Sequence, residues 1–178
     1  PGEIAILAPF VSDALRFSLA QRLEVSGIAS RTHRPSRSLR EEPVTHCLFT
    51  LSKLAHPHWF LTSEKDFLPN RFDLSYALVQ AIEGLDLVRA QLLAKIVYRV
   101  KDGQAQLSPF DIIRPEVQER ITYRLGARYQ HLRDWLESSQ SGGEVELDIF
   151  FSRLFGEVLS QPGFGFHTDY NAAKVTAN

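Results

Sequence analysis

Methionine is absent from all 178 positions, including the first, and cysteine occurs once, as Cys47. A single cysteine excludes a disulfide framework and a zinc site built on cysteines. Because the chain does not start with methionine, we expect it to be a piece of a longer protein. The opening residues lack the charged segment and apolar stretch of a signal peptide, and no apolar run approaches the roughly 18 residues that span a bilayer. These absences predict a cytoplasmic protein with no membrane partner.

An excess of charge of one sign is also missing, since 20 Lys and Arg residues balance 21 Asp and Glu residues. No overall field therefore draws the chain to nucleic acid or anionic lipid. Apolar residues are plentiful: 44% of the sequence is hydrophobic, and it contains 12 Phe, 5 Tyr and 2 Trp residues. That much apolar surface excludes disorder as the main state and predicts one globular domain or two small ones.

The first 60 residues alternate between strand and helix patterns. Residues 3–7 form a short apolar run, which is typical of a strand buried on both faces. A helix whose leucines recur every four residues follows and ends at Gly27, where a helix C-terminal glycine is expected. A second strand at 28–33 and a helix at 43–55, with Pro in its first turn, complete the pattern. This order is typical of an α/β unit.

The remainder of the chain shows mostly helical spacing. The expected helical stretches cover residues 74–85, which Gly84 interrupts, residues 88–100, which stop at Asp102-Gly103, and residues 117–136 and 147–158. The Ser- and Gly-rich residues 138–143 are expected to form a flexible loop. The predicted fold class is therefore α/β and predominantly helical. A partial α/β unit over residues 1–60 precedes a helical subdomain over residues 61–178.

No motif typical of a catalytic site stands out. His46, His56 and His58 do not provide the three or four ligands with set spacing that zinc needs, so we interpret the last two as a solvated loop pair. Cys47 lies within an apolar helix and is predicted to be buried. Residues 163–166 contain two glycines but no Walker lysine, and they are interpreted as a loop that inserts aromatic rings into a core. We expect no cofactor and no ATP hydrolysis in this chain.

The strongest local charge comes from four closely spaced arginines with no acid among them: Arg31, Arg34, Arg37 and Arg40. Serine and threonine residues lie between them. Guanidinium groups beside hydroxyl donors suit phosphate oxygens, so these arginines are the candidate DNA-binding residues. The alternative is a solvated loop in which the arginines pair with Glu41 and Glu42.

A second group of arginines accompanies the predicted helix at 117–136. Its members are Arg114, Arg120, Arg124, Arg128 and Arg133. Arginines that flank an apolar helix stripe usually form surface or interdomain ion pairs, and we interpret this group in that way. The acidic residues that could serve as their partners are Glu137, Glu144, Glu146 and Asp148.

Several of these segments resemble one family. Pro1-Gly2-Glu3-Ile4-Ala5-Ile6-Leu7 resembles the opening of motif IV in superfamily-one DNA helicases of the UvrD/Rep/PcrA type. Ser26-Gly27-Ile28-Ala29 and Arg37-Ser38-Leu39-Arg40-Glu41-Glu42-Pro43-Val44 resemble the region of motif IVa, and residues 44–55 match the helix that follows it. The resemblance covers residues 3–57, about a third of the chain.

The resemblance implies that residues 1–60 begin the RecA-like subdomain 2A and that residues 61–178 form a helical insertion similar to subdomain 2B. The parent protein would be an ATP-dependent DNA helicase that uses ATP and Mg²⁺ in DNA unwinding, repair or replication. This part would grip and orient DNA, single-stranded or at a junction, and contact the remaining helicase subdomains. Ala8 and Pro9 stand where the family has Tyr-Arg, so these positions cannot contact the nucleotide as the family does. The alternative function is a helical protein-interaction module that binds no nucleic acid.

Overall fold

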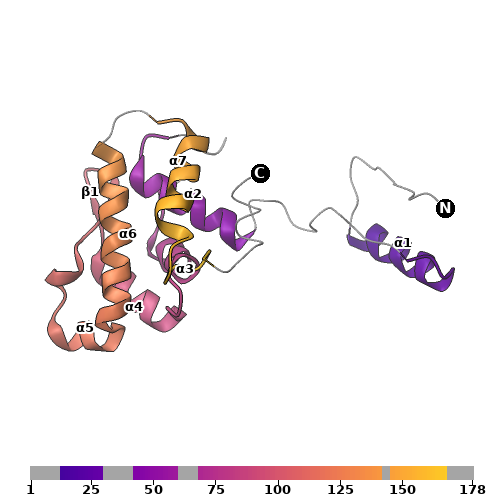
Figure 1. Ribbon diagram of the computed structural model, residues 1–178, viewed down its shortest axis with the longest axis horizontal. Coiled ribbons are helices and arrows are strands. Elements are labelled where there is room, and N and C mark those ends of the chain that lie inside the picture. The colour runs from indigo at the N-terminus through magenta and orange to yellow at the C-terminus, as the bar shows by residue number, and fades with distance from the viewer. Residues whose placement is uncertain (1–12, 30–41, 60–67, 142–144, 168–178) are drawn as a thin grey trace. The chain divides into compact units, whose positions relative to one another are not determined.

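The structure, a computed structural model, describes residues 13–29, 42–59, 68–141 and 145–167 (Figure 1). Two compact units make up the chain, Pro1–Leu39 and Arg40–Asn178. The strands predicted at 3–7 and 28–33 lie outside the described residues, except that Ile28 and Ala29 have no regular secondary structure. None of the described helices is both long and apolar enough to cross a bilayer.

Helix α1 (Asp13–Val25) is the described element of the first unit, and it confirms the helix predicted there. Its C-terminus is a Schellman motif, in which Gly27 N–H donates to the carbonyl of Glu24 at 2.9 Å and Ile28 N–H donates to that of Leu23 at 2.8 Å. Gly27 has φ +72°, a conformation that glycine adopts without strain. The predicted role of this glycine is therefore confirmed.

The described residues of the second unit are mostly helical, with one small antiparallel sheet, which confirms the predominance of helix in the predicted fold class. Its elements are α2 (Pro43–Ala55), α3 (Arg71–Ala81), α4 (Leu87–Val97), β1 (Tyr98–Lys101), β2 (Gln104–Leu107), the 3₁₀ helix η2 (Phe110–Ile112), α5 (Pro115–Ile121), α6 (Tyr123–Ser141), α7 (Leu147–Leu154) and the π-helical turn η3 (Phe155–Leu159). Because α2 packs on α3, both belong to one compact unit. The subdomain boundary predicted at residue 60 rests on the sequence pattern and the resemblance, and it stays a prediction.

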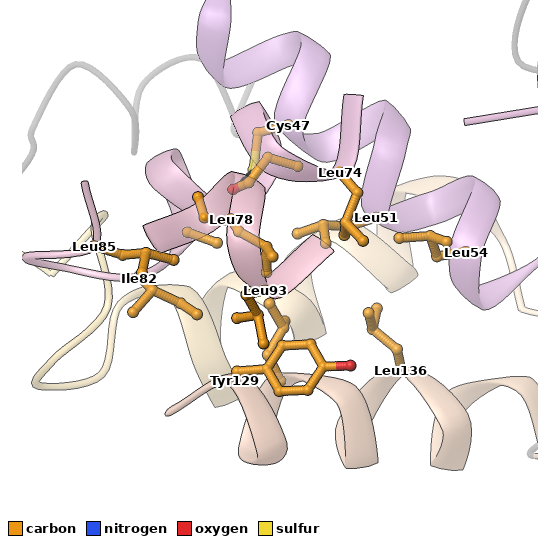
Figure 2. Close-up of a cluster of buried hydrophobic side chains, with 14 of the residues drawn as sticks. Cys47, Leu51, Leu54, Leu74, Leu78, Ile82, Leu85, Leu93, Tyr129 and Leu136 are labelled. Carbon is orange, nitrogen blue, oxygen red and sulfur yellow. Dashed lines mark hydrogen bonds between the residues drawn. The ribbon is translucent and has the colours of Figure 1, made fainter. Parts of the chain in front are cut away.

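The core of this unit lies where α2, α3 and α4 meet α6 (Figure 2). Its fully buried side chains include Tyr129 of α6 and four leucines of α2, α3 and α4: Leu51, Leu74, Leu78 and Leu93. Burying one such leucine stabilises the fold by roughly 1.5–3 kcal/mol. Helix α2 begins and ends at the predicted residues because Pro43 suits the first turn and the residue before Pro57 is disfavoured in a helix.

Helix α3 starts at a capping box, in which the Asn70 side chain accepts bonds from two backbone N–H groups and Asp73 accepts one from Asn70 N–H at 2.8 Å. It ends at Ala81, and Gly84 at φ +79° makes the turn into α4, as the predicted interruption requires.

The helix predicted to continue to Val100 is wrong beyond Val97. The chain there turns into the β1–β2 hairpin, which places Tyr98 opposite Leu107 and Lys101 opposite Gln104. Asp102 and Gly103 have φ +52° and +75°, the conformation of a type I′ turn. The dipeptide that was interpreted as a helix stop is thus a hairpin turn.

The single long helix predicted over 117–136 is two helices. Thr122 separates α5 from α6 with φ +81°, a strained value for a β-branched residue. Its hydroxyl accepts a bond from Leu125 N–H at 3.4 Å and so helps to start α6. At the other end α6 continues through Ser141, so residues 138–141 of the predicted loop are helical.

The segment after η3 folds back onto α3. Ile82 and Phe164 form an antiparallel bridge, and Gly165 N–H donates to the carbonyl of Ala81 at 2.9 Å. A side chain at Gly165 would collide with the backbone carbonyl of Gln80. Phe164 and Phe166 are 5% and 3% exposed, so the prediction that this loop inserts aromatic rings into the core is confirmed.

Candidate functional site

The four candidate DNA-binding residues, Arg31, Arg34, Arg37 and Arg40, lie outside the described residues. Their role therefore stays a prediction from the sequence. Within the described part of the chain, three features are candidates for a functional site: other cations, a buried aromatic cluster and an exposed aromatic edge.

Two arginines of α6 make ion pairs within the fold. Arg128 donates to the Glu83 carbonyl at 2.6 Å and lies 4.0 Å from its carboxylate. Arg133 pairs with Glu137 at 2.9 Å and donates to the Leu107 carbonyl at 3.3 Å. These contacts join α6 to the turn after α3 and to the end of the hairpin. For these two arginines the ion-pair interpretation is confirmed.

The other three arginines of this group, Arg114, Arg120 and Arg124, are exposed. None of them pairs with an acid among the described residues. Arg89 reaches the backbone carbonyl of Arg120 at 3.2 Å, but the guanidinium of Arg120 is not involved in that bond. These three cations are surface groups, and their charge is available to a partner in solution.

A buried aromatic cluster surrounds the end of α2, and His56 lies at its centre with 2% exposure. Its ring stacks on Trp59 with centroids 4.1 Å apart, and it meets the edge of Phe150 at 5.3 Å. His56 Nε2 also hydrogen-bonds Ser139 Oγ at 3.3 Å. The interpretation of His56 as solvated is therefore wrong, because α6 and α7 cover it, whereas His58 is exposed.

Two buried groups, His56 at the end of α2 and Cys47 within it, have pKa values outside their ordinary range. Burial lowers the pKa of His56, and the neighbouring His58 lowers it further, so the ring is neutral at pH 7. Burial raises the pKa of the Cys47 thiol, also on α2, to about 12. Cys47 is fully buried, as predicted, and its thiol is protonated and unreactive.

Lys53 holds the turn that follows α2. Its ammonium group donates to the carbonyls of Pro57 at 2.5 Å and of Trp59 at 3.0 Å. A cation beside the last carbonyls of a helix is favourable because the helix dipole is negative there. The lysine thus positions Trp59 for its stack on His56.

The buried groups around His56 contribute to the packing of the core. Ser139 and His56 are within hydrogen-bond reach, but both are buried, so a substrate has no access to the hydroxyl. Across the described ranges, no three His, Cys, Asp or Glu side chains gather to hold a metal ion. An open depression of about 420 Å³, lined by His58, Trp59, Val145 and Glu146, borders the cluster.

An exposed aromatic edge runs along α3, and sequence analysis did not identify it. Phe72 and Tyr76, one turn apart, are 67% and 53% exposed, and Leu68 lies four residues before Phe72 with 39% exposure. The available signal was their spacing of four residues on the side of α3 away from its buried leucines.

Scans against protein-family models, curated proteins and solved structures found no match to this chain.

Proposed function

We propose that this chain is a non-catalytic, DNA-engaging and regulatory part of a cytoplasmic, ATP-dependent DNA helicase of the UvrD/Rep type. In this proposal residues 1–60 begin the RecA-like subdomain 2A, and residues 61–178 form the helical insertion. ATP and Mg²⁺ bind elsewhere in the parent protein, because hydrolysis needs a phosphate cradle and a metal-holding carboxylate. The observation that carries the proposal is the motif IV and IVa pattern of residues 3–57, with its four arginines.

Two features of the described residues support the proposal. Helix α2 lies where the motif IVa pattern places a helix, and most of the described residues that follow it are helical, as the insertion requires. In addition, several exposed cations of this unit have no ion pair with another described residue, and they can attract phosphates. They are Arg71, Lys95, Arg99, Lys101, Arg114, Arg120 and Arg124.

The test is the salt dependence of DNA binding, measured by the fluorescence anisotropy of a labelled single-stranded oligonucleotide. Each phosphate contact of a single strand contributes a slope of about −0.7 in log K against log salt. The double variant Arg34→Ala/Arg37→Ala should therefore weaken binding and flatten the slope by about 1.4. Its thermal stability should be nearly unchanged.

The matched control is Arg120→Ala/Arg124→Ala, which removes the same charge from two exposed, unpaired arginines of α5 and α6. It should weaken binding less than Arg34→Ala/Arg37→Ala does, because the proposal places the main phosphate contacts on the arginines of the motif IVa region. If the parent chain shows no salt-dependent binding, or if the Arg34/Arg37 variant binds as well as the parent at low salt, the proposal is wrong.

The second candidate function is a helical protein-interaction module, and the exposed edge of α3 favours it. Phe72 and Tyr76 offer two aromatic side chains one turn apart, a spacing suited to docking against a protein partner. The same titration separates the two functions, because an interaction module gives no salt-dependent DNA binding. Phe72→Ser would then weaken the partner complex without changing the unfolding of the chain.

A further inference from the structure

The β1–β2 hairpin has two chemically different faces. The register pairs Arg99 with Gln106 and Lys101 with Gln104, so these four side chains share one face, which we call the outer face. All four are exposed. The outer face thus combines two cations and two side-chain amides, and no acid lies on it.

The opposite face attaches the hairpin to the helical core. Tyr98 and Ala105 on that face are 8% and 4% exposed. The Tyr98 hydroxyl donates to the Pro69 carbonyl at 2.5 Å, which ties β1 to the loop before α3. Arg133 of α6 donates to the Leu107 carbonyl at 3.3 Å, which holds the end of β2. The hairpin that carries the outer face is therefore attached to the helical core through both of its strands.

The charge of the outer face is not neutralised by the described surroundings. Neither Arg99 nor Lys101 forms an ion pair with a described acid, and the one acid of the hairpin, Asp102, lies in the turn. Some other exposed cations of the described surface are neutralised by an acid, as Arg153 is by Glu157 at 3.0 Å. The outer face thus carries two positive charges, and two side-chain amides that can form hydrogen bonds lie beside them.

We propose that the outer face of the hairpin docks on duplex DNA, with Arg99 and Lys101 on phosphates and Gln104 and Gln106 on groove edges. The inference rests on the proposed function and names the duplex-contacting surface within it. The two paired strands of a hairpin lie about 4.8 Å apart. The major groove is about 12 Å wide and admits a two-stranded ribbon.

The side chains of the outer face favour a duplex over a single strand. Single-strand binding surfaces add aromatic rings on which bases stack, and no aromatic residue lies on this face. Glutamine side chains suit the hydrogen-bonding edge that adenine presents in the major groove. Arginine and lysine serve phosphates irrespective of sequence.

The test compares binding of the full chain to a labelled duplex and to a single strand of the same length, over 50 to 200 mM salt. Two duplex phosphate contacts contribute a slope of about −1.8 in log K against log salt, or about a twelvefold change in affinity over this range. Arg99→Ala/Lys101→Ala should lose that contribution on the duplex only. Gln104→Ala/Gln106→Ala should weaken duplex binding at every salt concentration with an unchanged slope.

Two further variants act as controls. Arg99→Lys/Lys101→Arg conserves the charge and should keep the parent slope. Arg120→Ala/Arg124→Ala removes two cations elsewhere and should flatten the duplex slope less than Arg99→Ala/Lys101→Ala does. Urea unfolding of each variant should match that of the parent, because the altered side chains are exposed.

The possible outcomes separate this inference from the proposed function. If Arg99→Ala/Lys101→Ala binds duplex with the parent slope while Arg34→Ala/Arg37→Ala still weakens binding, the hairpin inference is wrong and the proposed function stands. An equal loss on single strands overturns the assignment to duplex. If the parent chain binds neither DNA, both the inference and the proposed function fail.

Discussion

Helices α1 and α2 are both 13 residues long, but they differ in how much of their surface is buried. Nine residues of α2 are buried, and from Thr50 to Ala55 every side chain is, including the polar ones. Of residues 18–25 in α1 none is buried, and Leu19 is 38% exposed. The comparison teaches that apolar residues at helical spacing predict a helix, whereas the extent of burial depends on the neighbouring elements.

Truncating one leucine in each helix gives the largest expected difference between them. Leu51→Ala removes a fully buried side chain of α2 and should lower the free energy of unfolding by about 2–5 kcal/mol. Leu19→Ala in α1 should change it by no more than about 0.5 kcal/mol. Urea unfolding monitored by far-UV circular dichroism, which detects the helices of both units, measures both variants. Equal losses would contradict the comparison.

The next largest change in the free energy of unfolding is expected at a buried polar residue of α2. Thr50 is 0% exposed, and its hydroxyl has no hydrogen-bond partner among the described residues. An unpaired buried hydroxyl costs about 1–3 kcal/mol, so Thr50→Val should raise the free energy of unfolding by about 1 kcal/mol. The control is Ser52→Ala, because the Ser52 hydroxyl donates to the Leu48 carbonyl at 2.6 Å. The prediction is wrong if Thr50→Val lowers the free energy of unfolding and Ser52→Ala raises it.

The end of α2 should also make stability depend on pH. Burial lowers the pKa of His56 below the 6.5 of the unfolded chain, so the unfolded state binds the proton first as the pH falls. Above pH 6.5 the neutral ring of His56 therefore costs the folded state nothing. Below pH 6.5 the free energy of unfolding falls, by at most about 1.4 kcal/mol per pH unit. His56→Phe keeps a ring in the stack but cannot titrate.

Urea unfolding at pH 7.5 and 5.5 measures this effect. The difference between the two free energies should be smaller in His56→Phe than in the parent chain. His58→Gln should retain most of the difference, since burial, not the neighbouring His58, is the larger cause of the lowered pKa. The same pH dependence in His56→Phe and the parent would show that another group is responsible.

The smallest global effect is expected at the end of α1. Gly27→Ala places a side chain on a residue with φ +72°, although nothing lies within 4 Å to obstruct it. The strain of about 1 kcal/mol should speed amide exchange in the last turn of α1 about fivefold. The urea midpoint of the α2 core should not move. A shifted midpoint would show that α1 contributes to the stability of that core.

The helix positions were predictable because their signals are local. Pro43, Pro57 and Gly27 determine where α2 and α1 begin or end through backbone geometry alone. The hairpin also had its signal, an Asp-Gly pair between alternating apolar residues. That signal was outweighed in the prediction by the four-residue spacing that continues from α4 to Val100.

The burial of His56 could not be predicted from the sequence. Its aromatic partners are Trp59, three residues later, and Phe150, whose position next to the end of α2 results from the packing of α7. The exposure of Phe72 and Tyr76 has the same origin, since their side of α3 is the one that α2 and α4 leave open. Aromatic residues alone do not reveal which of them will be covered.

The sequence by itself determined the local structure of this protein: helix starts at a proline or an asparagine cap, helix ends at a glycine or before a proline, and a tight turn at Asp102-Gly103. These features depend on the backbone preferences of one or a few consecutive residues. Only the tertiary structure decided that His56 is neutral and buried, that Arg128 and Arg133 are paired, and that the cations of the hairpin stay exposed. Burial and ion pairing depend on segments far apart in the chain, and it is packing that brings those segments together.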